Sequence, residues 1–304
     1  MEEWKRPLMA AGAGAISGTA IGLLGFLFVS AGQYPNMGLT LFFLVPAVAG
    51  ASIAMVARKP DIAAVAAALL SAVCSLLILI AFGKEGPLCA ILAFPVIFIG
   101  LSIGLAIGML LRKLLVKHGV NQTTTFGVII LAAPTVIFAG DRMERPVLQD
   151  PRTEIVQTSV EVDDTPEHVW SRILSIDSVQ ASKPFLMYVG LPIPQRCTLQ
   201  GRGVGAKRTC YFDVGYIEET VTEWKPPYYL GLSIDRTHMP GRHWLAFESA
   251  EYRLQPNGAK TLLTRTTTVT SHLHPAWYWR PFERLGVQSE HSYILQDVVL
   301  RSRH

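Results

Sequence analysis

The sequence predicts two domains of different class: an all-α transmembrane bundle at 1–140 and, after a linker at 141–153, an α+β domain at 154–304 in which a curved antiparallel sheet wraps a long C-terminal helix. Half of the 304 residues are apolar and only 16% are charged. The mean hydropathy of +0.33 is higher than soluble globular proteins usually show. At Glu154 the long apolar runs give way to alternation with period two, which indicates strands.

Charge is also divided unevenly between the two halves. Residues 1–140 hold 8 Lys and Arg against 4 Asp and Glu, whereas residues 141–304 hold 19 of each. The net charge of +4 therefore belongs to the first half. Nucleic-acid binding needs a local excess of Lys and Arg, so no nucleic-acid partner is expected for the second half.

Four apolar runs in the first half contain no Asp, Glu, Lys or Arg, and each is long enough for the roughly 20 residues that a membrane-spanning helix needs. They cover 8–31, 38–57, 62–83 and 88–111. A fifth run at 125–140 is shorter and carries Pro134, so it either spans the bilayer or lies at its surface. The first run exceeds the apolar core of about 7–15 residues in a signal peptide, and we expect it to stay as a span.

Basic residues in the short loops predict the orientation, because cytoplasmic loops are enriched in Lys and Arg. One side of the predicted bundle holds seven basic residues and the other holds Lys84 alone, which places the N-terminus in the cytoplasm of a multi-pass protein of the cell (inner) membrane. The seven are Lys5, Arg6, Arg58, Lys59, Arg112, Lys113 and Lys117. If the fifth run spans, the C-terminal domain lies outside; with four spans it is cytoplasmic.

Glycines recur every fourth position in the first and fourth runs. Such spacing lets helix backbones approach closely, either inside one bundle or in a homo-oligomer. The residues are Gly14, Gly18, Gly22, Gly100, Gly104 and Gly108. Because the four runs contain no ionisable residue of the kind that marks a transport path, the bundle is predicted to be an anchor or scaffold whose partner is the lipid bilayer.

The second half is predicted to begin with a strand at 154–162. Thr165 as N-cap and Pro166 at the first helical position then start a short helix, and a second short helix is placed at 178–189. Six strands follow, separated by Gly, Pro and Asn turns, and a final helix runs over 275–301. The strands are expected at 196–200, 206–213, 217–224, 228–235, 244–254 and 261–271.

Several segments of this half resemble the START/Bet v 1-like superfamily, also called SRPBCC or polyketide cyclase/dehydrase. Residues 162–170 are similar to its first strand and helix, residues 201–208 and 221–230 to its second hairpin and its E-W-x-P-P strand turn, and residues 275–284 to the start of its long helix. The resemblance covers about 154–303. It implies a helix-grip domain enclosing an elongated, mainly apolar cavity for lipids, sterols or polyketides, and it implies no catalytic residue.

Five residues are candidates for contact with such a hydrophobic ligand: Tyr211, Asp213, Trp224, Arg265 and His291. His291 lies in one helical stripe with residues 287, 294 and 298. Arg265 is expected opposite Glu251 if Leu254 pairs with Leu262, either as a solvent-side ion pair or as a charged pair that fixes a polar head group.

No cofactor and no metal site is predicted. The glycines of 201–205 join two strands and lack the ending of a phosphate-binding loop. His272 and His274 have no third ligand nearby.

The leading functional hypothesis is a membrane-anchored protein that binds a hydrophobic ligand without covalent chemistry. A second hypothesis is a cyclase or dehydratase that uses Asp213, Arg265 or His291 as acid, base or oxyanion partner. Titratable side chains converging inside the cavity would favour the enzyme. The third is a membrane assembly or sensory module that oligomerises through the glycine stripes.

Two cysteines bear on which side of the membrane holds the C-terminal domain. The hairpin centred on 203–204 puts Cys197 opposite Cys210 on neighbouring strands, at a separation that permits a disulfide. Such bonds persist outside the cytosol, so a bridge and five spans are consistent with each other. The alternative is two unrelated core thiols, with the register one residue away.

Overall fold

The computed structural model describes residues 5–30, 37–57, 62–118, 122–148, 151–239 and 245–302. The chain forms two compact units. The helical unit comprises residues 1–85, 89–150 and 272–275, and the sheet unit comprises 86–88, 151–271 and 276–304. Of the residues used above, Arg58 and Lys59 lie outside the described residues.

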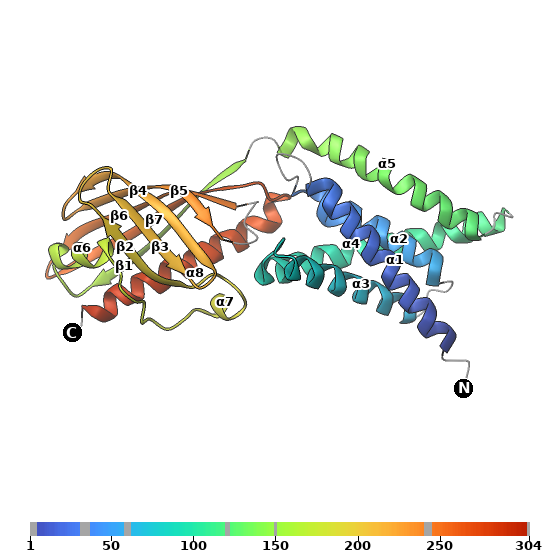
Figure 1. The fold of residues 1–304 in the computed structure, drawn as a ribbon, viewed down its shortest axis with the longest axis horizontal. Coiled ribbons are helices and arrows are strands. Elements are labelled where there is room, and N and C mark those ends of the chain that lie inside the picture. Colours follow the sequence, from blue (N-terminus) through green and yellow to red (C-terminus); the bar gives the residue numbers. More distant parts are fainter. Residues whose placement is uncertain are drawn as a thin grey trace. The chain divides into compact units, whose positions relative to one another are not determined.

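The helical unit contains α1 (Lys5–Ser30), the π-helical turn η1 (Thr40–Leu44) that leads into α2 (Val45–Ala57), α3 (Ile62–Ala81), α4 (Pro87–Lys117) and α5 (Gln122–Leu148) (Figure 1). Among the described residues, three helices are long and apolar enough to cross a membrane: Ala11–Ser30, Ile62–Ala81 and Pro87–Leu115. The run at 38–57, the second of the four predicted spans, instead gives a shorter apolar helix over Thr40–Val56.

Both glycine stripes are covered by helices of the same chain. A Cβ at Gly18 of α1 would overlap Ile53 of α2 and Ser71 of α3, and a Cβ at Gly104 of α4 would overlap the backbone of Ala47 in α2. The close approach that the spacing predicts is therefore made inside the bundle. The alternative, a homo-oligomer through these glycines, stays a prediction.

Helix α5 extends into the segment 141–153 that was predicted as a linker. The helix continues to Leu148, because the charged residues after the apolar run have partners within the helical unit. Arg145 lies 2.7 Å from Asp141 one turn earlier, and the Asp141 side chain is only 1% exposed. Glu144 accepts the backbone N–H of Thr40 at 2.8 Å, at the start of η1. The fifth apolar run, 125–140, is helical throughout.

Within the described residues, the sheet unit has seven strands in the order β1-β7-β6-β5-β4-β3-β2, all antiparallel. They are β1 (Arg152–Val162), β2 (Pro194–Gln200), β3 (Lys207–Phe212), β4 (Gly215–Lys225), β5 (Tyr229–His238), β6 (Leu245–Asn257) and β7 (Lys260–Ser271). The first strand pairs with the last, so that Arg152 lies opposite Ser271. The long helix α8 (Ala276–Arg301) runs along the concave side of the sheet (Figure 1).

The unit also contains two short helices among its described residues, α6 (Pro166–Leu174) and α7 (Phe185–Tyr188). Thr165 is the N-cap residue of α6, with Pro166 in the first turn as predicted. Helix α7 is much shorter than the predicted 178–189. Val179 instead donates its N–H to the carbonyl of Gln195 in β2, and a residue that precedes a proline, such as Lys183, disfavours helical backbone.

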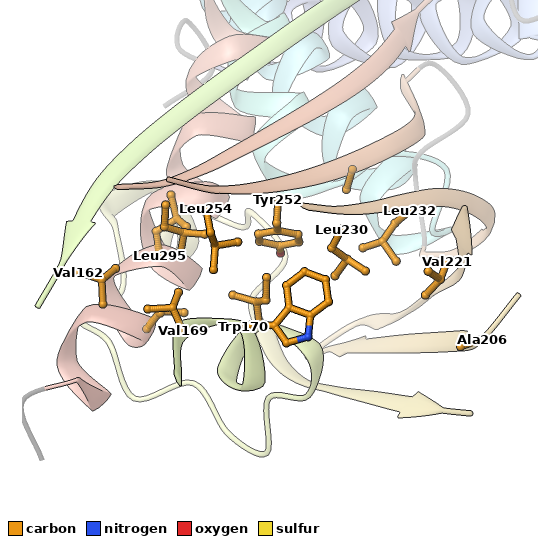
Figure 2. Packing of buried hydrophobic residues seen from close by; sticks show 14 residues of the cluster. Val162, Val169, Trp170, Ala206, Val221, Leu230, Leu232, Tyr252, Leu254 and Leu295 are labelled. Atoms are coloured by element: carbon orange, nitrogen blue, oxygen red, sulfur yellow. The ribbon is translucent and has the colours of Figure 1, made fainter. Parts of the chain in front are cut away.

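The hydrophobic core of the sheet unit lies between α6, the sheet and the C-terminal half of α8. Its centre is Tyr252, whose ring lies between Leu230 and Leu254 and above Trp170 of α6 (Figure 2). Trp224 packs edge to face on Trp170 with ring centroids 5.2 Å apart. This end of the unit is filled by side chains, most of which are under 2% exposed.

Candidate functional site

Helix α8 faces the sheet with a stripe that alternates between apolar and polar residues. Glu283, Val287, His291 and Leu295 follow each other at four-residue spacing, and all four are buried. Val287 packs with Val156 and Val269, and Leu295 joins the core around Tyr252. The interior is therefore layered along α8, with a polar layer at His291 between two apolar ones. The stripe at 287, 291, 294 and 298 is buried throughout.

The first ion pair of the polar layer joins β3 to β4. Arg208 and Glu219 are direct cross-strand neighbours, and Arg208 Nη1 lies 2.7 Å from Glu219 Oε2 with both side chains almost fully buried. Nη2 of Arg208 donates to the carbonyl of Ile173 at 3.3 Å. Burial opposes the charge of Arg208, but Glu219 outweighs it and raises the pKa of the guanidinium, which stays cationic.

A second ion pair joins β7 to α8. Arg265 Nη2 lies 3.1 Å from Glu290 Oε1, and the Arg265 side chain is 8% exposed. Burial disfavours the charge of Arg265, yet Glu290 and the other groups around it raise its pKa above the ordinary value. The two guanidinium carbons lie 5.5 Å (Arg265) and 5.9 Å (Arg208) from the ring centroid of Tyr252, within cation–π range. Tyr252 thus connects both pairs.

Some donors of these two arginines have no partner. Among the described residues, no hydrogen-bond acceptor reaches Nε and Nη1 of Arg265 or Nε of Arg208, although all three atoms are buried. Buried polar groups are satisfied in the great majority of cases, and an exception asks for a missing water, ion or ligand. The polar layer therefore offers N–H groups to a further acceptor.

His291 completes the layer as a neutral group. Its Nε2 lies 2.7 Å from Thr267 Oγ1 and its Nδ1 lies 3.1 Å from Thr158 Oγ1, so one ring nitrogen donates and the other accepts. The side chain is fully buried. Burial, and then the nearby charge of Arg265, lower the pKa of His291 to about 2. The imidazole is consequently unprotonated at physiological pH and a poor general acid or base.

Burial of a neutral histidine makes stability depend on pH. The folded-state pKa of about 2 lies below the unfolded value of about 6.5, so the unfolded chain takes up the proton first. The stabilisation is complete above pH 6.5 and is lost as the pH falls. Between pH 7 and pH 5 we expect a loss of about 2 kcal/mol in the free energy of unfolding from this group.

A His291→Gln variant isolates this contribution. Urea unfolding at the two pH values, in wild type and variant, measures the difference in pH dependence. An equal loss in both proteins would show that His291 is not the group responsible.

Only two of the five predicted ligand contacts, Arg265 and His291, meet in this layer. Tyr211 alternates with the inward-facing Cys210 and so lies on the other face of β3, where Arg196 stacks on its ring at 4.4 Å. Asp213 is exposed in a turn, where it accepts the N–H of Ile193. Trp224 belongs to the packed core beside Trp170. Tyr211 and Asp213 therefore do not lie in the polar layer with Arg265 and His291.

The expected pairing of Glu251 with Arg265 is also wrong, because the register differs by one residue. Leu254 pairs with Leu263, so Tyr252 lies opposite Arg265 and Glu251 lies opposite Thr266. A shift of one residue moves a side chain to the other face of the sheet. Arg265 does have a charged partner in the interior, but that partner is Glu290 of α8.

Four residues of the layer were not predicted: Arg208, Glu219, Tyr252 and Glu290. One signal in the sequence was available, because Arg208 and Glu219 hold the same strand positions as the apolar residues Cys210, Ile217 and Val221. That parity places both charges on the inner face.

A separate ionic cluster lies at the N-terminal end of α8. The carboxylate of Glu154 contacts Arg152 at 2.8 Å, Arg280 at 2.5 Å and Arg284 at 3.2 Å, and Glu283 contacts Arg152 at 2.8 Å. Although burial opposes it, bonding to Arg152 and Arg280 lowers the pKa of Glu154. This cluster joins α8 to the first strand and closes the layered interior at that end.

Cys197 and Cys210 lie directly opposite each other on β2 and β3, and their sulfurs are bonded. The bond lies next to the polar layer, since Cys210 and Arg208 share the inner face of β3. Cys74 and Cys89 of the helical unit are not in a disulfide.

Comparison with known proteins gives only distant likenesses. No family model and no curated protein matches the chain. Solved structures that resemble the C-terminal half include a protein of Nitrosospira multiformis (18% identity, TM-score 0.35, 50% of this chain and 100% of that one). Two others are the Zhui aromatase/cyclase of Streptomyces sp. R1128 (17%, 0.36, 50% and 94%) and norcoclaurine synthase of Thalictrum flavum (11%, 0.33, 51% and 90%).

Proposed function

We propose that this chain is a membrane-anchored binding protein that holds a hydrophobic ligand between the sheet and α8. The polar layer carries the proposal. Two ion pairs are buried between apolar layers, where replacing such pairs by apolar residues is often neutral or stabilising. Stability alone therefore gives little reason for them, whereas ligand pockets are mostly apolar with a few well-placed polar groups.

The helical unit supports a function at the bilayer. Its three apolar helices of spanning length would keep the binding unit beside the membrane, where an insoluble ligand can be exchanged without crossing water. We propose the cell (inner) membrane as the location, with the N-terminus in the cytoplasm.

The two cysteines of the sheet unit support a proposal for its side of the membrane. The bond between Cys197 and Cys210 supports a sheet unit outside the cytosol, because cytosolic disulfides are rare. With the N-terminus in the cytoplasm, this placement requires an odd number of spans, so the shorter apolar helix at Thr40–Val56 and α5 must either both cross the bilayer or both stay out of it.

One observation favours the cyclase or dehydratase alternative: titratable side chains do converge in the interior. Their protonation states argue for binding over turnover, because acid–base catalysis works best with a pKa near the operating pH. His291 has a pKa of about 2, and Asp213 lies outside the layer. Arg265 remains suited to stabilise a negative charge.

A bulky side chain in the apolar layer tests the binding function. We expect Val287→Trp to abolish co-purification of bound lipid, because Val287 faces Val156 and Val269 inside the unit. The matched control is Leu285→Trp, on the exposed side of the same helix, which should retain the ligand. The measurement is mass spectrometry of lipids extracted from the purified full chain.

Val156→Phe provides a second, smaller obstruction if Val287→Trp fails to fold. Ligand retained at the wild-type level in the folded interior variant would refute the proposal.

A further inference from the structure

We infer that the ligand is a long-chain acid, whose carboxylate accepts hydrogen bonds from the unpartnered N–H groups of Arg265 and Arg208. This inference rests on the proposed function and adds the class of molecule. The proposed function rests on the buried ion pairs, whereas this inference rests on the chemical type of the buried atoms that have no hydrogen-bond partner.

All unpartnered atoms of the polar layer are donors. They are Nε and Nη1 of Arg265 and Nε of Arg208. No carboxylate oxygen of Glu219 or Glu290 is among the buried side-chain atoms without a partner in the described part of the chain. A ligand that fits this layer therefore supplies acceptors and needs no acceptor in return.

A carboxylate meets this requirement better than other polar ends. It is acceptor-only when ionised, with two oxygens and about four lone-pair positions, and its bonds to guanidinium are shorter and roughly twice as strong as those between neutral groups. A hydroxyl also has an O–H donor, which would need an acceptor and would compete with the arginines for the carboxylates of Glu219 and Glu290. An ammonium is repelled by both guanidinium groups.

Apart from Glu219 and Glu290, each of which is paired with one of the two arginines, the neighbouring groups carry no negative charge. His291 donates or accepts only as a neutral ring, and Thr158 and Thr267 are uncharged. Glu290 occupies only Nη2 of Arg265 and keeps some exposure, with 13% of its side chain accessible. The other acidic residue, Glu219, is held by Arg208 at 2.7 Å.

The test uses a matched series of photoactivatable C16 probes with a diazirine in mid-chain: the acid, the methyl ester and the alcohol. The full chain in nanodiscs is irradiated with each probe, and labelled peptides are mapped by mass spectrometry. We expect the acid to label peptides of β7 and α8 at least 10-fold more than the alcohol, with the ester between them. Labelling of the membrane helices serves as the internal measure of probe concentration.

Two variants connect the preference to the arginine. In Arg265→Met/Glu290→Leu both partners of the pair are removed, so no buried charge is left alone, and labelling by the acid should fall to the level of the alcohol. Arg253→Met is the control, because Arg253 is an exposed arginine of the neighbouring strand β6.

The outcomes separate this inference from the proposed function. Equal interior labelling by all three probes would overturn the acid and leave hydrophobic binding intact. The absence of interior labelling by any probe would overturn both. A double variant that keeps the preference for the acid would overturn the role of Arg265.

Discussion

Replacing Arg208 by Met should lower the free energy of unfolding of the sheet unit by about 3–5 kcal/mol, the usual effect of removing one partner of a buried ion pair. In the wild-type structure Arg208 lies 2.7 Å from the carboxylate of Glu219. The variant leaves this carboxylate buried without a cation. It also removes the donor to the carbonyl of Ile173. Methionine retains most of the volume, so the loss reports charge and hydrogen bonding more than packing.

The double variant Arg208→Met/Glu219→Leu is the matched comparison, and it should recover most of the lost stability because no charge is left unpaired. Urea unfolding followed by tryptophan fluorescence reports the sheet unit selectively, since every tryptophan except Trp4 lies after residue 150. If the double variant is as unstable as the single one, the unpaired carboxylate of Glu219 is not the cause of the lost stability.

Replacing Gly104 by Val should disrupt the helical unit and cost about 3 kcal/mol or more, at the upper end of what overpacking does. A Cβ at this position overlaps the carbonyl oxygen of Ala47, and backbone atoms cannot rotate away as a side chain can. Helix α4 would have to separate from α2 along the whole stripe. The thiols of Cys74 and Cys89 report the loss of structure when a thiol-reactive fluorescent dye is present during heating.

Gly12→Ala is the control for Gly104→Val. Gly12 lies in α1, and a Cβ added there meets nothing within 4 Å; because alanine also favours helix more than glycine does, the midpoint of thermal unfolding should not fall. A Gly104→Val protein that unfolds at the same temperature as wild type would mean that α4 and α2 are not in contact at this stripe.

The strands and the long helix could be predicted from sequence because their signals are local. Alternation with period two placed all seven strands within a few residues, and Pro166 placed the start of α6. The spans were less certain: the run at 38–57 is apolar enough, but its helix begins only at Thr40 and starts with a π-helical turn. An apolar run shows the region of the sequence in which a membrane helix lies, but it does not determine the residues at which that helix begins and ends.

The polar layer depends on information that the sequence does not carry locally. Which face of a strand is buried depends on register, and one residue of difference at the β6–β7 hairpin separated Glu251 from Arg265. A bulge between Val221 and Glu223 changes the alternation and turns Trp224 towards the core. A charged residue on a strand is normally predicted to face solvent. Its burial can be recognised only when its partner on another strand or helix is known, as with Glu290 for Arg265.

The pairing of the first strand with the last has a practical consequence. Because Arg152 lies opposite Ser271 and α8 begins five residues after Ser271, the polypeptide enters the sheet unit and starts its last helix at the same end. The 26 residues of α8 then carry the chain about 39 Å along the helix axis. The last turn of α8 is thus at the opposite end of the sheet unit from both connections, and a fluorescent label attached there would lie away from the residues that join this unit to the helical unit.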